Sequence, residues 1–557
     1  MQPTGVTTPD VPAPGETAVV AVPDSWRIPL QRGAKHPGRS TQELARPTYA
    51  PVPLPPTDAE KYLYAKRRLA PITIFSLISF TGLLISQLMF FRTAPWLLAL
   101  VPLTLFTVVY YIISLGVNGF TKGFDLAAHK ALITSWQPTR WPSVDVFLPV
   151  CGEAPFVLQN TWESVRQMAL QYPGPVDVYV LDDSSDAVLE RMALGFGFVY
   201  QRRPNRGWYK KAGNMRYAFE RSMSDYILVL DADFAPRVDM IKEMLPYFDQ
   251  EPDLGIVQSP QFFRVHPGQG WLERGAGAVQ ELFYRSVQVS RNNHEAAICV
   301  GSCAMYKRAA LAEIGGNTLI DHSEDVHTGF DLRRAGWRLR YIPIALAAGV
   351  CPADVNSFFT QQYRWCAGSM SLLGSKKFWE QDLKFRARLS YISGFCYYLH
   401  TGVFALVTPI VPLIMLVLLP EHVGLANYLL IVPSVLYNMV IFPLWHKCKY
   451  GLDSFTVKMI YGWSHFFAIV DILRGRRMGW QPTGGTKKKS RTRRLWLAMG
   501  LWGGGTGLLW TAIAAYRMIS DDAPTFAPLF LTGMFSLTVT AQALLIDPMK
   551  DRAEVLP

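Results

Sequence analysis

The sequence predicts a cytoplasmic α/β domain with a doubly wound, mostly parallel sheet, inserted into an α-helical transmembrane bundle of about six spans. Two observations lead to this prediction. Half of the 557 residues are hydrophobic and the mean hydropathy is +0.13, because several apolar runs reach transmembrane length. Between the second and third runs, short apolar strands alternate with helical patterns, which is typical of a parallel sheet covered on both faces.

Apolar runs of sufficient length occur six times. They cover residues 71–90, 95–116, 396–420, 426–445, 495–516 and 526–546. Lys and Arg collect before the first run ("KRR", 66–68), after the fourth ("HKCK", 446–449) and over 474–494, whereas the other short loops carry few of them. The positive-inside rule therefore predicts a multi-pass plasma-membrane protein with both termini and the α/β domain in the cytoplasm.

The rest of the chain divides by composition. Residues 1–60 are rich in proline and contain no apolar segment of a cleavable signal peptide, so we expect a disordered tail. The predicted order is tail 1–60, first span pair 61–117, α/β domain 118–355, interfacial amphipathic helices 356–395, second span pair 396–446, interfacial helix and basic loop 447–494, third span pair 495–546 and tail 547–557.

The net charge of +12 is compatible with nucleic acid or anionic lipid as a partner. Much of this charge lies beside the spans, so we expect the lipid bilayer and no nucleic acid. The seven cysteines form no CxxC pair, which fits a reducing compartment and predicts no zinc framework.

Acidic residues follow the first three predicted strands of the domain. They are Glu153, Asp182, Asp183, Asp231 and Asp233, after strands predicted at 144–150, 176–183 and 226–234. In open α/β sheets, ligands bind outside the carboxyl ends of the strands. Asp is also common after strands as a helix N-cap or turn residue, and this alternative remains open for Asp182 and Asp183.

Asp231 and Asp233 are two residues apart, so on an extended chain they point the same way. A divalent cation between them would relieve their repulsion. Mg²⁺ or Mn²⁺ typically takes one or two carboxylates and completes its shell with substrate phosphates and water. We therefore expect a metal site that a diphosphate substrate completes.

The segment "DHSEDVHTGFDLRRAG" (321–336) predicts a turn and then a helix, with Ser323 as N-cap and Glu324 and Asp325 in the first turn. Acids at this position either pair with the helix dipole or serve as a rigidly held catalytic acid or base.

In "QQYRWCAGSM" (361–370), helical spacing places Gln361, Arg364 and Trp365 on one face. Arg suits phosphate oxygens, Trp stacks on a sugar ring, and Gln binds hydroxyls, so the set suits a sugar diphosphate. The alternative is an interfacial anchor helix with a snorkelling Arg.

Together these motifs resemble the membrane-embedded, processive family 2 glycosyltransferases, especially bacterial cellulose synthase catalytic subunits and related β-glucan synthases. The motifs are the acidic pair after a strand, "KAGN", the DxD, the "ED" pair and QxxRW, in this order and flanked by spans. The resemblance covers residues from about 60 to 546 and implies a glycosyltransferase A-type fold.

The resemblance also implies roles for individual residues. Asp325 matches the general base, Asp231 and Asp233 match the metal-binding DxD, and Trp480 and Thr483 in "WQPTGG" lie where the family has a gating loop. Residues that match positions binding the nucleotide sugar are Glu153, Asp182, Asp183, Lys211, Asp231, Gln361, Arg364 and Trp365. Residues that match positions near the acceptor are Gly301, Ser302, Glu324 and Trp365.

The chain departs from the family pattern at three places. "VCGE" (150–153) replaces Thr-Tyr-Asn-Glu, "DDS" replaces Asp-Asp-Gly, and "WQPTGG" lacks the lysine and valine of the cellulose synthase gating loop. About ten residues follow the last span, which leaves no room for a PilZ domain.

The resemblance implies an inverting enzyme that polymerises a β-linked glucan from UDP-glucose with Mg²⁺ or Mn²⁺ and moves the growing polysaccharide across the membrane, with accessory export subunits as further partners. Aromatic residues near the third span, at 391, 395, 397 and 398, are candidates for stacking on that polymer, or are the aromatic side chains common at a membrane interface. Alternatives are a synthase that uses UDP-GlcNAc or GDP-mannose, and a non-processive enzyme that glycosylates a polyprenyl-phosphate carrier. A transporter with a nucleotide-binding domain is less consistent with the sequence, because no GxxxxGK[ST] phosphate loop is present.

Overall fold

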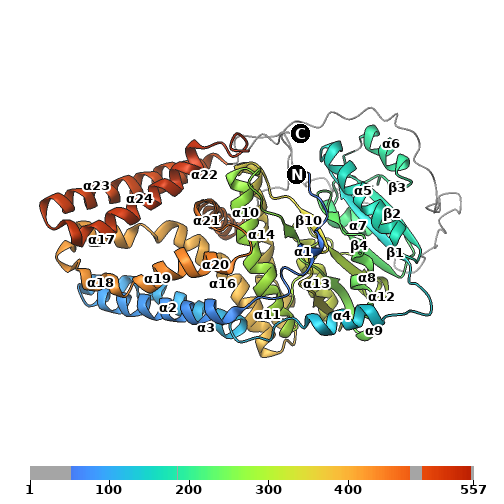
Figure 1. Ribbon diagram of the computed structural model, residues 1–557, viewed down its shortest axis with the longest axis horizontal. Helices are drawn as coiled ribbons and strands as arrows, with labels where there is room; N and C mark the ends of the chain where they lie inside the picture. Colours follow the sequence, from blue (N-terminus) through green and yellow to red (C-terminus); the bar gives the residue numbers. More distant parts are fainter. Residues whose placement is uncertain (1–51, 185, 477–491, 553–557) are drawn as a thin grey trace, which may run out of the picture.

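The computed structural model describes residues 52–184, 186–476 and 492–552. Two parts are visible in Figure 1: a bundle of long helices on the left and a lobe of strands and helices on the right. The lobe holds a mixed sheet with helices on both faces, which confirms the predicted α/β domain.

The main sheet has seven strands in the order β3-β2-β1-β4-β8-β6-β9. The strands are β1 (Val144–Val150), β2 (Val176–Asp182), β3 (Val199–Gln201), β4 (Tyr226–Val229), β6 (Leu254–Gln258), β8 (Ala304–Lys307) and β9 (Arg338–Tyr341). β1 pairs in parallel with β2 and β4, whereas β8 is antiparallel to its neighbours β4 and β6. The sheet is therefore mostly parallel, with one antiparallel strand.

Helices cover both faces of this sheet because its central strand is apolar on both sides. Val146 and Leu148 of β1 belong to one buried cluster with residues of α5, α6 and α8, and Phe147 belongs to a second cluster with residues of α7 and α12. The alternation follows from the two-residue period of a strand. The helices of the lobe are α4 (Leu126–Ser135), α5 (Pro155–Gln171), α6 (Ala187–Gly195), α7 (Lys210–Phe219), α8 (Met240–Met244), α9 (Pro246–Gln250), α10 (Trp271–Leu282), α11 (Gln288–Asn293), α12 (Arg308–Glu313), α13 (Glu324–Arg334), α14 (Val355–Leu373) and α15 (Lys376–Glu380).

A smaller sheet lies beyond the carboxyl end of β4. Its strands are β5 (Ala235–Pro236), β7 (Phe262–Phe263) and β10 (Ala347–Gly349), in the order β5-β10-β7. A Cβ on Gly349 would lie 2.5 Å from the ring of Phe234, so glycine is required where β10 passes the acidic turn. This close approach brings the chain that leads into α14 next to Asp233.

Five helical segments are long and apolar enough to cross a membrane. They are Leu69–Phe91, Pro95–Asn118, Phe385–Val417, Arg493–Ser520 and Ala523–Leu545. They contain α2 (Leu69–Phe91), α3 (Val101–Asn118), α16 (Phe385–Val407), α17 (Ile410–Val417), α22 (Arg493–Leu497), α23 (Gly505–Ser520) and α24 (Ala523–Leu545). Five of the six predicted spans are thus present by length and composition.

The fourth predicted span, 426–445, differs from the prediction. It is divided into α18 (Leu425–Leu429), α19 (Val432–Leu436), a π-helical turn and α20 (Phe442–Trp445), and its longest apolar stretch is Val432–Trp445. Pro433 has no N–H to donate to a carbonyl of α18, so the helix is interrupted before α19 although the sequence stays apolar.

α21 (Leu452–Leu473) connects the two parts of the molecule. Figure 1 shows it nearly end-on, across the direction of the long helices. It contacts α10 and α14 of the lobe as well as α16 and α24 of the bundle. The lobe therefore packs directly on the end of the bundle.

The predicted boundary of the tail at residue 60 lies too late in the chain. The Arg264 guanidinium donates to the Leu54 carbonyl at 3.1 Å and pairs with Glu60 at 2.7 Å, and Lys61 pairs with Asp239 at 2.7 Å. Contacts with the lobe begin by Pro53, whose carbonyl accepts from Asn160. The proline-rich composition did not reveal these long-range ion pairs.

Candidate active site

A cavity of about 790 Å³ opens at the carboxyl ends of β1 and β4. The predicted site residues that line it are Glu153, Asp183, Lys211, Asp231, Asp233, Glu324, Asp325, Gln361, Arg364 and Trp365. They come from segments up to 212 positions apart in the sequence. Asp182, Gly301 and Ser302 are not among the lining residues, although the Gly301 carbonyl accepts from Lys211 and the Ser302 hydroxyl accepts from the Asp231 N–H. Trp480 and Thr483 are outside the described residues.

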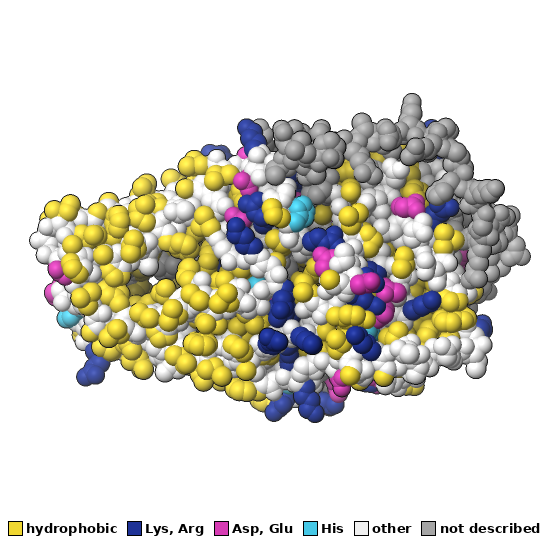
Figure 2. All heavy atoms as spheres, in the orientation of Figure 1, with side chains coloured by type: hydrophobic (Ala, Val, Ile, Leu, Met, Phe, Trp, Pro, Cys, Tyr) yellow, Lys and Arg dark blue, Asp and Glu magenta, His cyan; other side chains and the backbone are white. Residues whose placement is uncertain are grey.

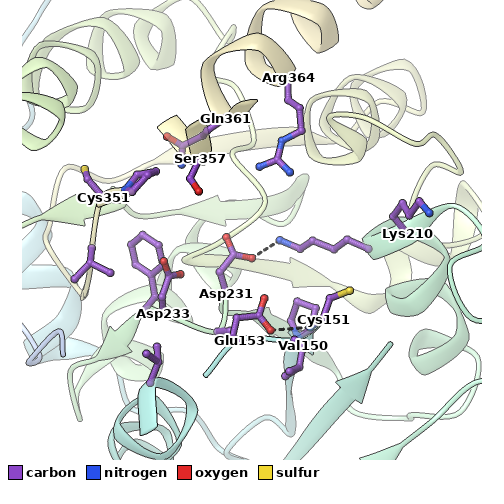
Figure 3. Close-up of a pocket in the computed structure, with 18 of the residues that line it drawn as sticks. Val150, Cys151, Glu153, Lys210, Asp231, Asp233, Cys351, Ser357, Gln361 and Arg364 are labelled. Carbon is purple, nitrogen blue, oxygen red and sulfur yellow. Dashed lines mark hydrogen bonds and ion pairs between the residues drawn. The ribbon is translucent and has the colours of Figure 1, made fainter. Parts of the chain in front are cut away.

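Three carboxylates gather on the floor of the cavity, as Figure 3 shows for Glu153, Asp231 and Asp233. Burial and the neighbouring charges of Asp231 and Glu153 raise the pKa of Asp233 to about 7. Burial, with Asp231 and Asp182 nearby, also raises the pKa of Glu153. Like charges at short range resist ionisation together, so this floor favours a cation.

Lys211 on α7 provides one positive charge there. Its ammonium donates to the Asp231 carboxylate and, at 2.8 Å, to the Gly301 carbonyl. Burial alone would lower the pKa of Lys211, but Asp231, Glu324 and Asp325 outweigh it and raise this pKa. The lysine stays charged and spans the floor between the DxD turn and the segment before β8.

Asp325 lies in the first turn of α13, as predicted, and packs tightly. Its carboxylate accepts from the Val326 N–H at 2.8 Å, and a Cβ on Gly301 would lie 2.9 Å from it. Burial and the adjacent Glu324 raise the pKa of Asp325 to about 7. A carboxyl group with this pKa is suited to accepting a proton near neutral pH.

The turn before Asp325 differs from a simple N-cap. Ser323 occupies the N-cap position with φ of 54°, and its side chain makes no capping hydrogen bond. Its hydroxyl instead faces α14, where a Cβ on Gly368 would lie 1.7 Å away. Glycine at 368 therefore allows α14 to approach the "HSED" turn and fixes the distance between the two motifs.

α14 carries the QxxRW residues over the cavity from the side opposite the acids. Asp354 caps the helix by accepting from the Ser357 N–H at 2.9 Å. Gln361 and Arg364 point down into the cavity in Figure 3, and Trp365 lines it too. Burial lowers the pKa of the Arg364 guanidinium, although Glu324 and Asp231 counteract this. The buried cation faces the acids across the space that a substrate would fill.

The two acids that end β2 have different surroundings. Asp182 is fully buried and accepts from the Ser184 N–H at 2.6 Å and the Tyr200 hydroxyl at 2.7 Å. Asp183 lines the cavity and binds Arg203 through both carboxylate oxygens, at 2.7 and 2.6 Å. The turn interpretation left open for this pair thus describes Asp182, whose contacts organise the turn.

The cavity floor fits a divalent cation only in combination with a substrate. Among the described residues, no group of three or more His, Cys, Asp or Glu side chains is arranged to hold a metal ion. Asp231 and Asp233 offer hard carboxylate oxygens, the donor type that Mg²⁺ and Mn²⁺ prefer. Two carboxylates with phosphate oxygens would suffice.

Several residues around the cavity were not predicted. Arg203 holds Asp183, and its signal in the sequence is only a basic cluster, "QRRPNR". Arg552 lines the cavity and pairs at 2.8 Å with Glu273 at the start of α10. No local pattern links a residue after the last span to this site, so sequence reasoning had no means of finding it.

The chain matches a family model and several characterised proteins. Residues 226–445 match the model described as "Glycosyl transferase family group 2". The cellulose synthase 1 catalytic subunit [UDP-forming] of Komagataeibacter xylinus is 31% identical over 268 residues, which are 46% of this chain and 35% of that protein. The cellulose synthase catalytic subunit [UDP-forming] of Pseudomonas fluorescens (strain SBW25) is 31% identical over 309 residues, which are 55% of this chain and 41% of that protein.

Among solved structures, the mannosyltransferase PcManGT from Pyrobaculum calidifontis, in complex with GDP-Man and Mn²⁺, aligns with a TM-score of 0.46 at 15% identity, covering 67% of this chain and 98% of that one. The chain spans only about 35–41% of the length of the two curated relatives. The family match identifies a family 2 glycosyltransferase domain, and cellulose synthase catalytic subunits are its homologues.

Proposed function

We propose that this protein is a processive, inverting hexosyltransferase that polymerises a β-linked polysaccharide, most simply a β-glucan from UDP-glucose, and moves it across the plasma membrane. One observation carries the proposal: the DxD acids, Asp325 and the QxxRW residues line a single cavity at the end of a helical bundle. The homology to cellulose synthase catalytic subunits supports it.

The donor's diphosphate would lie between the acidic floor and α14. Arg364 binds phosphate oxygens from above, and Lys211 moves from Asp231 to the diphosphate when the donor enters. Asp231 and Asp233 would hold Mg²⁺ or Mn²⁺, which supplies charge to neutralise the departing diphosphate. The nucleoside extends toward Asp183 and Lys210, where the cavity continues beside Cys151.

Asp325 acts on the acceptor. It accepts the proton of the acceptor's hydroxyl as that oxygen attacks the anomeric carbon. The new carbon–oxygen bond forms on the face of the anomeric carbon opposite the diphosphate. The bond between that carbon and the diphosphate breaks, and the diphosphate leaves with the electron pair. An α-linked donor therefore gives a β-linked product. Trp365 supplies the aromatic surface on which the terminal sugar of the acceptor stacks.

The polymer would leave between α16 and α21. Tyr397, Tyr398, Tyr461 and His465 form a group of aromatic rings there, with centroids 4.8 Å apart for Tyr398 and His465 and 6.3 Å for Tyr397 and Tyr461. The buried Nε2 of His465 has no hydrogen-bond partner among the described residues, so it is available to a sugar hydroxyl. The other two candidate aromatics, Tyr391 and Phe395, pack with Phe378 in a buried cluster and serve the core instead.

The proposal is tested by incubating purified full-length protein in lipid nanodiscs with a panel of radiolabelled UDP-glucose, UDP-GlcNAc and GDP-mannose, with Mg²⁺, Mn²⁺ or a chelator. We expect an insoluble β-linked polymer from one donor, metal-dependent and sensitive to a linkage-specific glucanase. A label found only in an extractable lipid-linked monosaccharide would show that the enzyme is non-processive. No transfer from any donor by a folded protein would overturn the proposal.

A further inference from the structure

A compact group of polar side chains lies where the bundle meets the lobe, outside the cavity described above. We call it the junction cluster, and it consists of His446, Tyr450 and Lys458. The rings of His446 and Tyr450 are 4.4 Å apart. The Lys458 ammonium lies 5.1 Å from the Tyr450 ring and 5.2 Å from the ring of Phe442 at the end of α20. The cluster thus links α20 to α21.

The hydrogen-bonding capacity of the junction cluster is not met by the protein. His446 and Tyr450 are each 7% exposed, and within the described part of the chain neither the His446 Nε2 nor the Tyr450 hydroxyl has a hydrogen-bond partner. A buried polar group without a partner destabilises the fold, because it has lost its hydrogen bonds to water. Two neighbouring polar atoms left without partners indicate a ligand that the protein alone does not supply.

The charge of the cluster is also uncompensated. Among the ion pairs of residues 52–184, 186–476 and 492–552, none involves Lys458. Burial lowers the pKa of Lys458 to about 8, so the ammonium remains mostly charged at neutral pH. Glu281 is the acid that acts electrostatically on His446. Its carboxylate already accepts from Arg285 at 2.6 Å and from the Lys447 N–H at 2.9 Å. The aromatic rings compensate Lys458 only in part.

More cations surround the cluster on the surface. They are the exposed residues Lys66, Arg68, Lys447 and Lys449. Two contacts hold their backbones together: the Trp445 indole donates to the Arg67 carbonyl at 2.6 Å, and Arg285 donates to the Trp445 and Lys66 carbonyls. Figure 2 shows such Lys and Arg side chains gathered between the hydrophobic bundle and the lobe.

Apolar surface continues from the cations along the bundle. Leu444 is 78% exposed, and Leu436 and Met439 of the same helical stretch are 47% and 44% exposed. Positive charge on one side and lipid-facing apolar side chains on the other match an amphiphile with an anionic head. A soluble anion would use only the charged half of this surface.

We propose that the junction cluster binds the phosphate of an anionic phospholipid from the leaflet that faces the lobe. The phosphate accepts from Lys458 and from the Tyr450 hydroxyl, the exposed cations contribute to selectivity for negative headgroups, and the acyl chains lie along Leu444. This inference does not depend on the chemistry of the cavity, so its failure would leave glycosyl transfer untouched.

The test is native mass spectrometry of the full-length protein in neutral detergent, with equimolar phosphatidylglycerol and phosphatidylcholine of identical acyl chains. We expect retention of phosphatidylglycerol over phosphatidylcholine by about tenfold, as a charge-assisted contact provides. Lys458→Met should abolish this preference. Lys242→Met, which removes the same charge from α8 in the lobe, should preserve it.

Tyr450→Phe provides a second variant that does not disturb the fold, because it keeps the ring and removes only an unpartnered hydroxyl. It should reduce the preference several-fold. No preference in the native protein, or an unchanged preference in both Lys458→Met and Tyr450→Phe, would overturn the proposal. So would displacement of the lipid by millimolar inorganic phosphate, which would identify a site for soluble anions.

Discussion

The acids at the two ends of the main sheet's strands, the amino edge and the carboxyl edge, have different surroundings. At the amino edge, Asp145 of β1 is fully buried, pairs with Arg308 at 2.9 Å and accepts from the Ser224 N–H at 3.0 Å. Asp225, just before β4, accepts from the Ser143 N–H and hydroxyl, both at 2.9 Å. Both carboxylates thus accept from protein donors, although burial still raises the pKa of Asp145 against the opposing effect of Arg308.

At the carboxyl edge, the acids face one another instead. Asp233 and Glu153 have pKa values raised by burial and by neighbouring carboxylates, and Asp325 has its pKa raised by burial and Glu324. Two cations that line the cavity act on these acids: Lys211 on the floor and Arg364 on α14. Removing the Asp145 or Asp225 carboxylate would leave its donors without an acceptor, whereas Asp233 is surrounded chiefly by other carboxylates. Substitutions at the two edges should therefore have opposite consequences.

The largest effect is expected for Asp325→Asn. An amide cannot accept the proton of the acceptor, so kcat should fall by about 10²–10⁴-fold. UDP affinity and the melting temperature should change little, because the lost charge was buried beside Glu324. The measurement is incorporation of labelled sugar into polymer, alongside UDP binding by calorimetry.

Asp331→Asn is the matched control on the same helix. Asp331 pairs with Lys377 at 2.9 Å and accepts from the Thr318 hydroxyl at 2.8 Å. This variant should lower the melting temperature and retain turnover. If Asp325→Asn polymerised at the native rate, another residue would have to be the base.

Much of the carboxyl edge was predictable because its signals are local. The strand that precedes Asp231 and Asp233, the first turn of the helix that contains Asp325 and the helical spacing of Gln361 and Arg364 each occupy a short window of sequence. The rule that ligands bind at the carboxyl ends of parallel strands then predicts that these windows meet.

The features that sequence reasoning missed depend on distant partners. The Asp145–Arg308 pair joins residues 163 positions apart, and the Arg552–Glu273 pair joins residues 279 positions apart. The break at Pro433 was also missed, since the apolar composition of 426–445 masks a single missing N–H. A hydrophobic run indicates the length and polarity of a segment, but it does not indicate which backbone hydrogen bonds of a helix form.

Asp145→Asn should have the next largest effect, on stability. Breaking one side of a buried ion pair leaves Arg308 without its counter-charge, and such changes cost about 3–5 kcal/mol. The melting temperature should fall by several degrees, while the turnover of the folded fraction stays near the native value.

Asp233→Asn is the same chemical change at the other edge. It removes a buried, repelled charge, so the melting temperature should stay constant or rise while metal-dependent activity is lost. Equal destabilisation by both variants would contradict the distinction between the two edges.

The remaining effect is a dependence of stability on pH. Asp233 and Asp325 have pKa values of about 7 in the folded protein, above the ordinary value of 3.8. A carboxyl group whose pKa is raised in the folded state stabilises the folded state at pH values where it is protonated. This contribution to the free energy of unfolding is lost as the pH rises toward 7. The melting temperature of the substrate-free protein should therefore fall between pH 5 and about 7.5, with at most about 1.4 kcal/mol per pH unit from each carboxyl group. Asp233→Asn should reduce the slope of the melting temperature against pH over this range. An unchanged slope in Asp233→Asn would mean that the carboxyl-edge acids are already neutralised in the free protein.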